Sequence, residues 1–339
     1  MASSNDDEQE LWGGFTSATS YADMAELVPT LPLETRCPPF PLRQHGGFWL
    51  PEFTLRRGVP AVHAPRPTDV LLASYPKSGT TWLKALAFAT AHRGAHPPAA
   101  DDHPLRRRNP HDLVPLLEMR FAHTDDGAAA AELEALPSPR VLATHLPFSL
   151  LSKRLLARTV YVCRDPKDAL VSSWIFSRRA SADMGVDAES FLLQEAVELF
   201  CAGRSVYGPQ WRHVVEYWEA SRRSVGGAEQ VLFLRYEEMI RDPVGNLKAM
   251  AEFMGCAFSQ EEEERGVVEA IVELCSMERL KSMEANRDGR TRLGVRGDAF
   301  FRKGVIGDWS SHMTPEMGKM VDEVVDDALR GSGFSFAAD

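Results

Sequence analysis

No stretch of this 339-residue chain is apolar over the ~20 residues that a membrane-spanning helix needs, so we expect no membrane span. Cysteine is scarce as well: the five cysteines lie far apart and form no CxxC pair. An odd number of scattered cysteines suits a reducing compartment rather than a disulfide framework. These absences predict a protein that folds without disulfides and has no membrane partner.

The opening ten residues lack the features of a targeting segment. They are acidic, with neither the basic-then-apolar order of a secretory signal nor the Arg-rich character of a transit peptide. Signals for lipid attachment are absent too, since no Gly follows Met1 and no Cys box stands at the C-terminus. We therefore expect a cytoplasmic protein.

Basic residues are outnumbered by acidic ones, 38 to 48, which gives a formal net charge of −10. A broad basic face that grips DNA or RNA is not expected, and we predict no nucleic-acid partner. A small anionic ligand is still compatible with this balance, because a few local Lys and Arg side chains can hold one. Hydrophobic residues make up 44% of the chain, which suffices for one large or two modest domains.

The ten histidines form no convincing metal site. His92 and His96 have the spacing of one helix face, but Gly94 and Pro97 interrupt that helix and no third ligand is evident. We interpret both histidines as surface residues and predict no bound metal.

Short apolar segments alternate with segments rich in helix-forming residues. Strands are expected at 69–74, 141–144, 159–163 and 231–237, and helices at 83–91, 149–156, 167–178, 190–203, 209–222 and 243–254. This rhythm is typical of the α/β class, in which a central parallel sheet is flanked by helices on both faces.

The regular rhythm covers only part of the chain. Residues 1–66 are expected to form an N-terminal arm and loops on the acceptor side, with a short strand at 48–50. Residues 67–339 are expected to form a single α/β domain. Within it, 94–140 is rich in Ala, Pro and Asp, and we predict a variable excursion with one short helix near 113–119.

The segment 74–82 lies between an apolar strand and a helix, where free backbone N–H groups and the helix dipole favour an anion. Lys77 adds a positive charge, Ser78, Thr80 and Thr81 add hydroxyl donors, and Gly79 lets the backbone approach a phosphate closely. The alternative is a plain capped turn between strand and helix. The order of residues is not that of a Walker A loop, and no Walker B aspartate is evident, which argues against a kinase or NTPase.

Two further groups of cations follow at wide spacing. Arg164 ends an expected strand, and Ser172 lies two helical turns later, so one phosphate could contact both. Arg302 and Lys303 precede Gly304, which lets the backbone reach the same anion. Taken singly, each group could also be an ordinary surface ion pair or a solvated charged loop.

In four segments, 75–82, 144–147, 161–172 and 301–309, the chain resembles the cytosolic sulfotransferases, in particular their plant branch, and the segments stand in that family's order. The resemblance implies a P-loop-like nucleotide-binding core and transfer of the sulfuryl group of PAPS (3′-phosphoadenosine-5′-phosphosulfate) to a hydroxyl of a small organic acceptor. The co-product would be 3′,5′-ADP. A kinase-like or catalytically silent nucleotide-binding protein is the alternative; a silent protein predicts loss of His145 or Lys77, and both are present.

The resemblance also assigns roles to single residues. The residues implied to bind the donor are Lys77, Ser78, Gly79, Thr80, Thr81, Trp82, Arg164, Ser172, Tyr236, Ser276, Met277, Arg302, Lys303 and Gly304. His145, at the end of an expected strand, is the implied general base, since imidazole titrates near neutrality. Lys77 is the second catalytic residue, because it would neutralise charge on the leaving oxygen during in-line displacement.

The chain departs from its animal relatives at two places. Ala143 stands where some of them carry a lysine two residues before the catalytic histidine. Ser310 and Pro315 replace the Lys and Val expected in the animal dimer motif, so we expect a monomer or a weak homodimer.

The acceptor pocket is expected to be apolar with one polar focus, and the acceptor to be phenolic, steroid or hormone-like. Phe148 and Phe176 are the first candidates for its lining, and Trp49 and Phe40 follow. Each of these aromatics could equally be part of the core.

Overall fold

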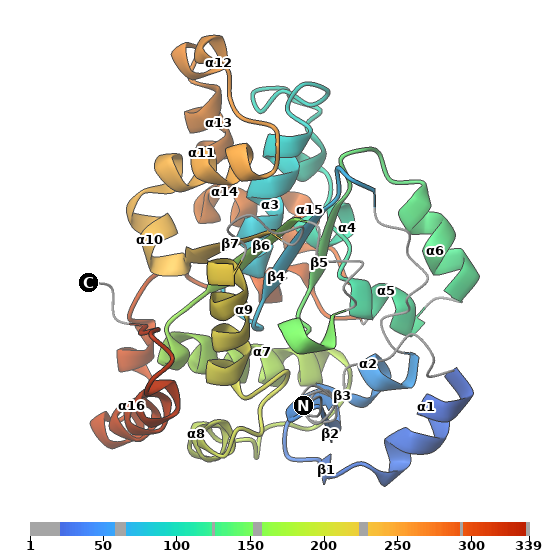
Figure 1. Ribbon diagram of the computed structural model, residues 1–339, viewed down its shortest axis with the longest axis vertical. Helices are drawn as coiled ribbons and strands as arrows, with labels where there is room; N and C mark the ends of the chain where they lie inside the picture. The colour runs from blue at the N-terminus through green and yellow to red at the C-terminus, as the bar shows by residue number, and fades with distance from the viewer. Residues whose placement is uncertain are drawn as a thin grey trace, which may run out of the picture.

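The computed structural model describes residues 21–57, 66–123, 126–151, 158–223, 230–291 and 294–336. At its centre four parallel strands stand in the order β5 (Val141–Thr144), β4 (Val70–Ser74), β6 (Arg158–Cys163) and β7 (Gln230–Arg235). Figure 1 shows this sheet between two layers of helices. The predicted α/β fold with a central parallel sheet is confirmed.

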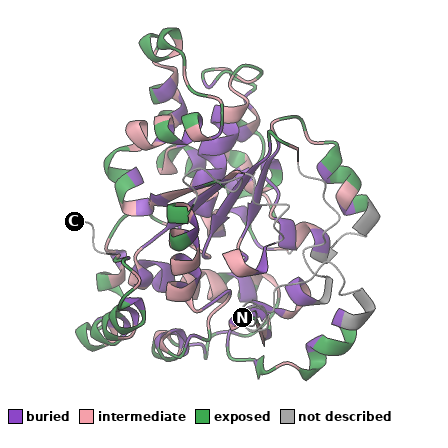
Figure 2. Ribbon diagram, viewed as in Figure 1, coloured by how far each residue is buried: buried purple, intermediate pink, exposed green. Residues whose placement is uncertain are grey.

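Both faces of the sheet are buried, which explains the continuous apolar runs of its strands. Along β4, Val70 and Leu72 belong to one hydrophobic cluster, and Leu71 and Ala73 belong to the other. Successive side chains of a strand point to opposite faces, so the two clusters are the cores on the two sides of the sheet. Figure 2 shows the strands and the inner sides of the helices as the buried part of the molecule.

Different helices cover the two faces. One core includes residues of α3 (Thr80–Ala91), α11 (Pro243–Phe253), α13 (Val267–Leu274) and α14 (Met277–Ser282). The other includes residues of α7 (Pro166–Asp183), α8 (Leu193–Cys201), α9 (Gln210–Arg223) and α16 (Pro315–Leu329). The strands and helices expected at 69–91, 141–144, 159–222 and 243–254 are therefore found, with ends shifted by a few residues.

A small antiparallel sheet precedes the central one. It consists of β1 (Leu33–Glu34), β2 (Leu42–His45) and β3 (Phe48–Pro51), with α1 (Tyr21–Leu27) and α2 (Glu52–Arg57) beside it. The short strand expected at 48–50 is confirmed. Trp49 in β3 bridges to Gly208, and this contact joins the small sheet to the loop before α9.

The segment 94–140 is more regular than expected. Instead of one short helix it contains α4 (Pro110–Leu113), α5 (Leu117–His123), α6 (Asp126–Glu134) and a 3₁₀ turn at Pro104–Arg106. Its apolar side chains reach the core: Leu105, Val114, Leu117 and Phe121 are all buried. Arg140 closes the segment with hydrogen bonds of 2.8 and 2.6 Å to Asp69.

Two other expectations were wrong in part. The strand predicted through 237 ends at Arg235, where α10 (Tyr236–Arg241) begins. The helix predicted at 149–156 is a 3₁₀ turn, Phe148–Leu150, and residues 152–157 lie outside the described part.

The remaining elements complete the chain. They are α12 (Gln260–Glu264), α15 (Glu284–Arg287) and 3₁₀ turns at Val28–Thr30, Gly297–Phe300 and Asp308–Ser311. Among the described residues, no helix is long and apolar enough to cross a membrane.

Candidate active site

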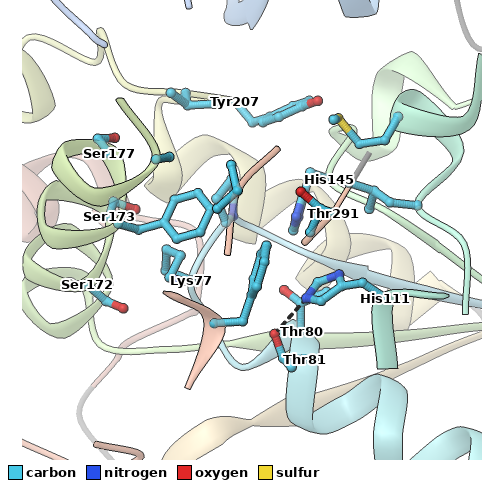
Figure 3. Close-up of a pocket in the computed structure, with 18 of the residues that line it drawn as sticks. Lys77, Thr80, Thr81, His111, His145, Ser172, Ser173, Ser177, Tyr207 and Thr291 are labelled. Atoms are coloured by element: carbon cyan, nitrogen blue, oxygen red, sulfur yellow. Dashed lines mark hydrogen bonds between the residues drawn. The ribbon is translucent and has the colours of Figure 1, made fainter. Parts of the chain in front are cut away.

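A cavity of about 300 Å³ opens where the parallel strands end. Its lining includes residues within two positions of the ends of all four strands of the central sheet, namely Pro76, His145, Arg164 and Tyr236. The carboxyl edge of a parallel sheet is where such folds bind ligands. In Figure 3 the serines of α7 stand on one side of this cavity, and His111 and His145 stand on the other.

The fifteen residues named at the outset as donor-binding or catalytic would have to meet here for a single site, and twelve of them line the cavity. Those in its lining are Lys77, Gly79, Thr80, Thr81, Trp82, His145, Arg164, Ser172, Tyr236, Met277, Arg302 and Gly304.

Three predicted residues do not line the cavity. Ser78 is fully buried, and its hydroxyl has no hydrogen-bond partner among the described residues. Ser276 caps α14, because its Oγ accepts a hydrogen bond of 3.2 Å from the N–H of Arg279. Lys303 lies half exposed and forms an ion pair of 2.6 Å with Asp308.

The loop after β4 has an unusual backbone. Lys77 has φ +65° and Gly79 has φ +105°, both in the left-handed region. A Cβ on Gly79 would lie 2.7 Å from the ring of Tyr236, so position 79 requires glycine for space as well as for its backbone angle. The hydroxyls of Ser74 and Thr80 are 2.6 Å apart and tie the strand to the first turn of α3.

Lys77 is a cation without a carboxylate partner among the described residues. Its Nζ lies 4.1 Å from the ring centre of Phe176 and 5.6 Å from that of Phe300. Burial, together with the positive charges of Arg164, Arg302 and Arg179, lowers the pKa of Lys77 to about 7. This concentration of positive charge favours an anion in the cavity.

Arg164 is held in place from several sides. Its guanidinium donates a 2.9 Å hydrogen bond to the carbonyl of Val305 and lies 4.6 Å from the ring centre of Tyr236. Asp168 lies 3.5 Å from the same guanidinium, and its carboxylate accepts hydrogen bonds from the N–H groups of Gly307 and Trp309. Asp168 therefore fixes the C-terminal loop beside Arg164.

Arg302 and Lys303 share one carboxylate, that of Asp308. Burial alone would raise the pKa of Asp308, but hydrogen bonds from Lys303 and Arg302 hold it well below its usual range. The Nε of Arg302 is buried without a partner among the described residues, as is the Nε of Arg164. Arg164 and Arg302, which both line the cavity, therefore each have one hydrogen-bond donor without an acceptor among the described residues.

His145 has the arrangement of a neutral base. Its Nδ1 lies 2.8 Å from the carbonyl oxygen of Ser74, which can only accept, so Nδ1 carries the proton. Nε2 then holds a lone pair, and no described residue bonds to it. Burial lowers the pKa of His145 to about 3, although the bond to Ser74 opposes this shift. The imidazole is therefore uncharged at neutral pH.

Glu118 supports His145 and was missed in the sequence. Its Oε1 accepts hydrogen bonds of 2.5 Å from the backbone N–H of His145 and 3.0 Å from the hydroxyl of Thr144. Burial raises the pKa of Glu118. The sequence held one sign of this role, because Glu118 is a carboxylate within the apolar run 113–119. In the structure Glu118 is 1% exposed.

Of the four aromatic residues predicted to line the acceptor pocket, two line the cavity and two do not. Phe40 and Phe176 line it, together with Phe53 and Tyr207. Phe148 instead packs on Tyr217, with ring centres 5.4 Å apart.

Trp49 lies in the core rather than at the cavity and is 7% exposed. The histidines predicted to be surface residues, His92 and His96, are half buried against Phe88. In the described part of the chain no group of three or more potential ligands could hold a metal ion.

The sheet and the cavity define an α/β protein with a cavity that several cations and a neutral imidazole line. The sulfotransferase domain family matches residues 67–333, and the chain belongs to the cytosolic sulfotransferase family. It is 41% identical over 321 residues to cytosolic sulfotransferase 7 of Arabidopsis thaliana, a match that covers 91% of this chain and 94% of that protein. Cytosolic sulfotransferase 11 of the same plant is 40% identical, over 91% of this chain and 87% of that protein.

Solved structures show the same fold. A putative steroid sulphotransferase of Arabidopsis thaliana superposes with a TM-score of 0.68 at 30% identity, and the match covers 99% of both chains. Mouse sulfotransferase SULT7A1 complexed with PAP superposes with a TM-score of 0.62 at 26% identity, over 86% of this chain and 95% of that one. The chain is a sulfotransferase, as predicted from its sequence, and relatives carry the name cytosolic.

Proposed function

We propose that the protein moves the sulfuryl group of PAPS to a hydroxyl of a small organic acceptor and releases 3′,5′-ADP. The observation that carries the proposal is the pairing of a neutral imidazole, His145, with a cluster of cations in one cavity. The family supports it, and the related mouse enzyme was solved with PAP, which is 3′,5′-ADP.

The donor would bind along the carboxyl edge of the sheet. Its phosphosulfate end fits the loop from Lys77 to Thr81, where the N-terminal amides of α3 offer donors. Its 3′-phosphate fits Arg164, Ser172 and the 302–304 loop, because Arg164 and Arg302 each have an Nε donor without a partner among the described residues.

The adenine would lie near the one indole in the cavity lining, that of Trp82. This ring meets Tyr236 edge-on, with centres 5.8 Å apart, so it is already fixed before a base stacks on it. Met277 lines the same region, and Ser276 and Lys303 would act from its edge. Lys, Arg and backbone dipoles together meet the donor's charge, and the mechanism we propose uses no metal.

In the proposed reaction His145 Nε2 takes the proton of the acceptor hydroxyl while the acceptor oxygen attacks sulfur. The bond from sulfur to the 5′-phosphate oxygen breaks, and Lys77 neutralises the charge that builds on that oxygen. Ser74 fixes the imidazole tautomer, and Glu118 fixes the backbone of His145. No covalent enzyme intermediate is needed for a single in-line displacement.

The acceptor would occupy the apolar end of the cavity, between Phe40, Phe53 and Tyr207, with its hydroxyl at His145. A phenolic, steroid or hormone-like molecule fits this lining, and one related plant structure is named a putative steroid sulphotransferase. The boundary at residue 66 and a monomeric or weakly dimeric state remain predictions.

Incubation with PAPS and a panel of phenols, flavonoids and hydroxysteroids tests the function. The expected result is acceptor-dependent formation of 3′,5′-ADP together with a sulfated product of matching mass. Failure to bind 3′,5′-ADP in calorimetry would overturn the proposal, because it would remove the donor site itself.

A further inference from the structure

A buried lysine behind the phosphate loop has no role in the function proposed above. Lys84 lies on the second turn of α3 and is 0% exposed. Its Nζ is 3.1 Å from Nδ1 of His111, its hydrogen-bond partner in the described part of the chain. His111 Nε2 is in turn 3.0 Å from the hydroxyl of Thr81, and both His111 and Thr81 line the cavity.

The direction of these hydrogen bonds follows from the charge of Lys84. An ammonium group can only donate, so a protonated Lys84 makes His111 Nδ1 the acceptor. The proton of the neutral imidazole then sits on Nε2 and is donated to the Thr81 oxygen. Thr81 has accepted one bond, and its own O–H is left to donate into the cavity.

We propose that Lys84, acting through His111, is a positioning residue that turns the Thr81 hydroxyl into a committed donor for the 5′-phosphosulfate end of the nucleotide. The inference rests on the proposed function and deepens it. We call these three residues the Lys84 relay.

Burial explains why the relay transmits charge. Successive hydrogen bonds polarise one another, and they do so most where water is excluded. His111 lies under the ring of Phe300, with ring centres 4.3 Å apart. The ammonium is thus kept out of the cavity, while its polarity reaches a hydroxyl in the cavity wall.

Nearby charges bear on the protonation of Lys84. Its pKa is lowered to about 7, chiefly by burial and also by the positive charge of Arg120, while the negative charges of Glu118 and Asp112 oppose the shift. The pKa of His111 is held well below its usual value by burial and by the adjacent Lys84, so the imidazole stays neutral. A bound phosphate would favour the ammonium form, because opposite charge stabilises it.

The test compares two nucleotides that differ at one end. Lys84→Met removes the charge and keeps the length of the side chain. We expect it to weaken binding of 3′,5′-ADP about tenfold, the loss of one charge-assisted hydrogen bond. Adenosine 3′-phosphate lacks the 5′-phosphate, and it should bind the variant and the wild type equally.

A double-mutant cycle provides the second measurement. In a Thr81→Val background the Lys84→Met change should alter 3′,5′-ADP affinity less than about twofold, since the relay acts through the hydroxyl. Thr90→Val is the matched control: Thr90 is fully buried on the same helix, its hydroxyl is unpartnered, and it lies outside the cavity lining. It should leave both affinities unchanged.

The outcomes separate the two proposals. Equal weakening of both nucleotides by Lys84→Met, or full additivity with Thr81→Val, would show that Lys84 serves the fold only and would overturn the relay. If the wild type binds neither nucleotide, the donor site itself is wrong. The relay is supported if Lys84→Met weakens binding of 3′,5′-ADP but not of adenosine 3′-phosphate, and if this effect is not additive with that of Thr81→Val.

Discussion

His145 is a single side chain whose removal separates chemistry from binding. We expect His145→Ala to lower turnover by about 10²–10⁴-fold, the usual contribution of a general base. The affinity for 3′,5′-ADP should change little, because the cations that would hold the nucleotide stay in place. Steady-state kinetics and calorimetry measure the two quantities.

His92→Ala is the matched control for this variant, since His92 packs on Phe88 away from the cavity. Wild-type turnover by the His145 variant would remove that residue from the role of base.

Arg164 should show the opposite pattern. Arg164→Ala removes a guanidinium that is 6% exposed and has one buried, unpartnered Nε. We expect 3′,5′-ADP to bind more weakly by roughly 1.5–3 kcal/mol, as for a charge-assisted hydrogen bond. Calorimetry measures the loss, and Arg265→Ala, in an exposed ion pair with Glu261, serves as control. An unchanged dissociation constant would contradict the donor site.

At the scale of elements, Asp168 links α7 to the loop that carries Arg302. Its carboxylate is 0% exposed and accepts from two backbone N–H groups of that loop. Asp168→Ala leaves both groups unpaired, at a cost of about 1–3 kcal/mol each, so we expect a lower Tm and weaker 3′,5′-ADP binding together.

Asp322→Ala tests whether any lost carboxylate near α7 has this effect. Asp322 lies on α16 and pairs with Lys167 of α7, but its side chain is half exposed. Its loss should therefore change neither Tm nor 3′,5′-ADP affinity measurably. If Asp168→Ala lowers Tm without changing 3′,5′-ADP affinity, the loop position that Asp168 fixes does not matter for nucleotide binding.

Elements that local rules govern could be predicted from the sequence. The strand, glycine loop and helix around Lys77 follow from an apolar run and from residues that suit a phosphate, all within 69–91. Lys77, His145 and Arg164 each come shortly after a strand end, so a parallel sheet brings them to one edge, whereas Arg302 follows a 3₁₀ turn.

Long-range contacts account for what was missed. Glu118 reaches His145 across 27 positions, and His111 reaches Lys84 across 27 as well. Both residues lie in 94–140, whose Ala- and Pro-rich composition hides its helices because their stability comes from burial. Tertiary packing also decided that Trp49 belongs to the core.

At the scale of the whole molecule, Lys77 and Lys84 are expected to couple ligand binding to pH. The pKa of Lys77 and that of Lys84 are both lowered to about 7 by burial, so both side chains are largely uncharged at pH 8. A bound nucleotide anion raises these pKa values again, and the complex must then take up protons.

Affinity for 3′,5′-ADP should therefore fall as the pH rises from about 7 to 9. Calorimetry at pH 8 in buffers of different ionisation enthalpy counts the protons. The groups whose charges act on Lys77 are Arg164, Arg302 and Arg179. Lys77→Met should reduce the uptake, and an uptake of zero in the wild type would contradict the shifted pKa values.

Ser74, the last residue of β4, makes two bonds in opposite directions: its carbonyl accepts from the imidazole of His145, and its hydroxyl meets Thr80. The base and the phosphate loop are thus both bonded to one residue at a strand end. A substitution that shifts Ser74 is therefore expected to disturb the imidazole and the loop together.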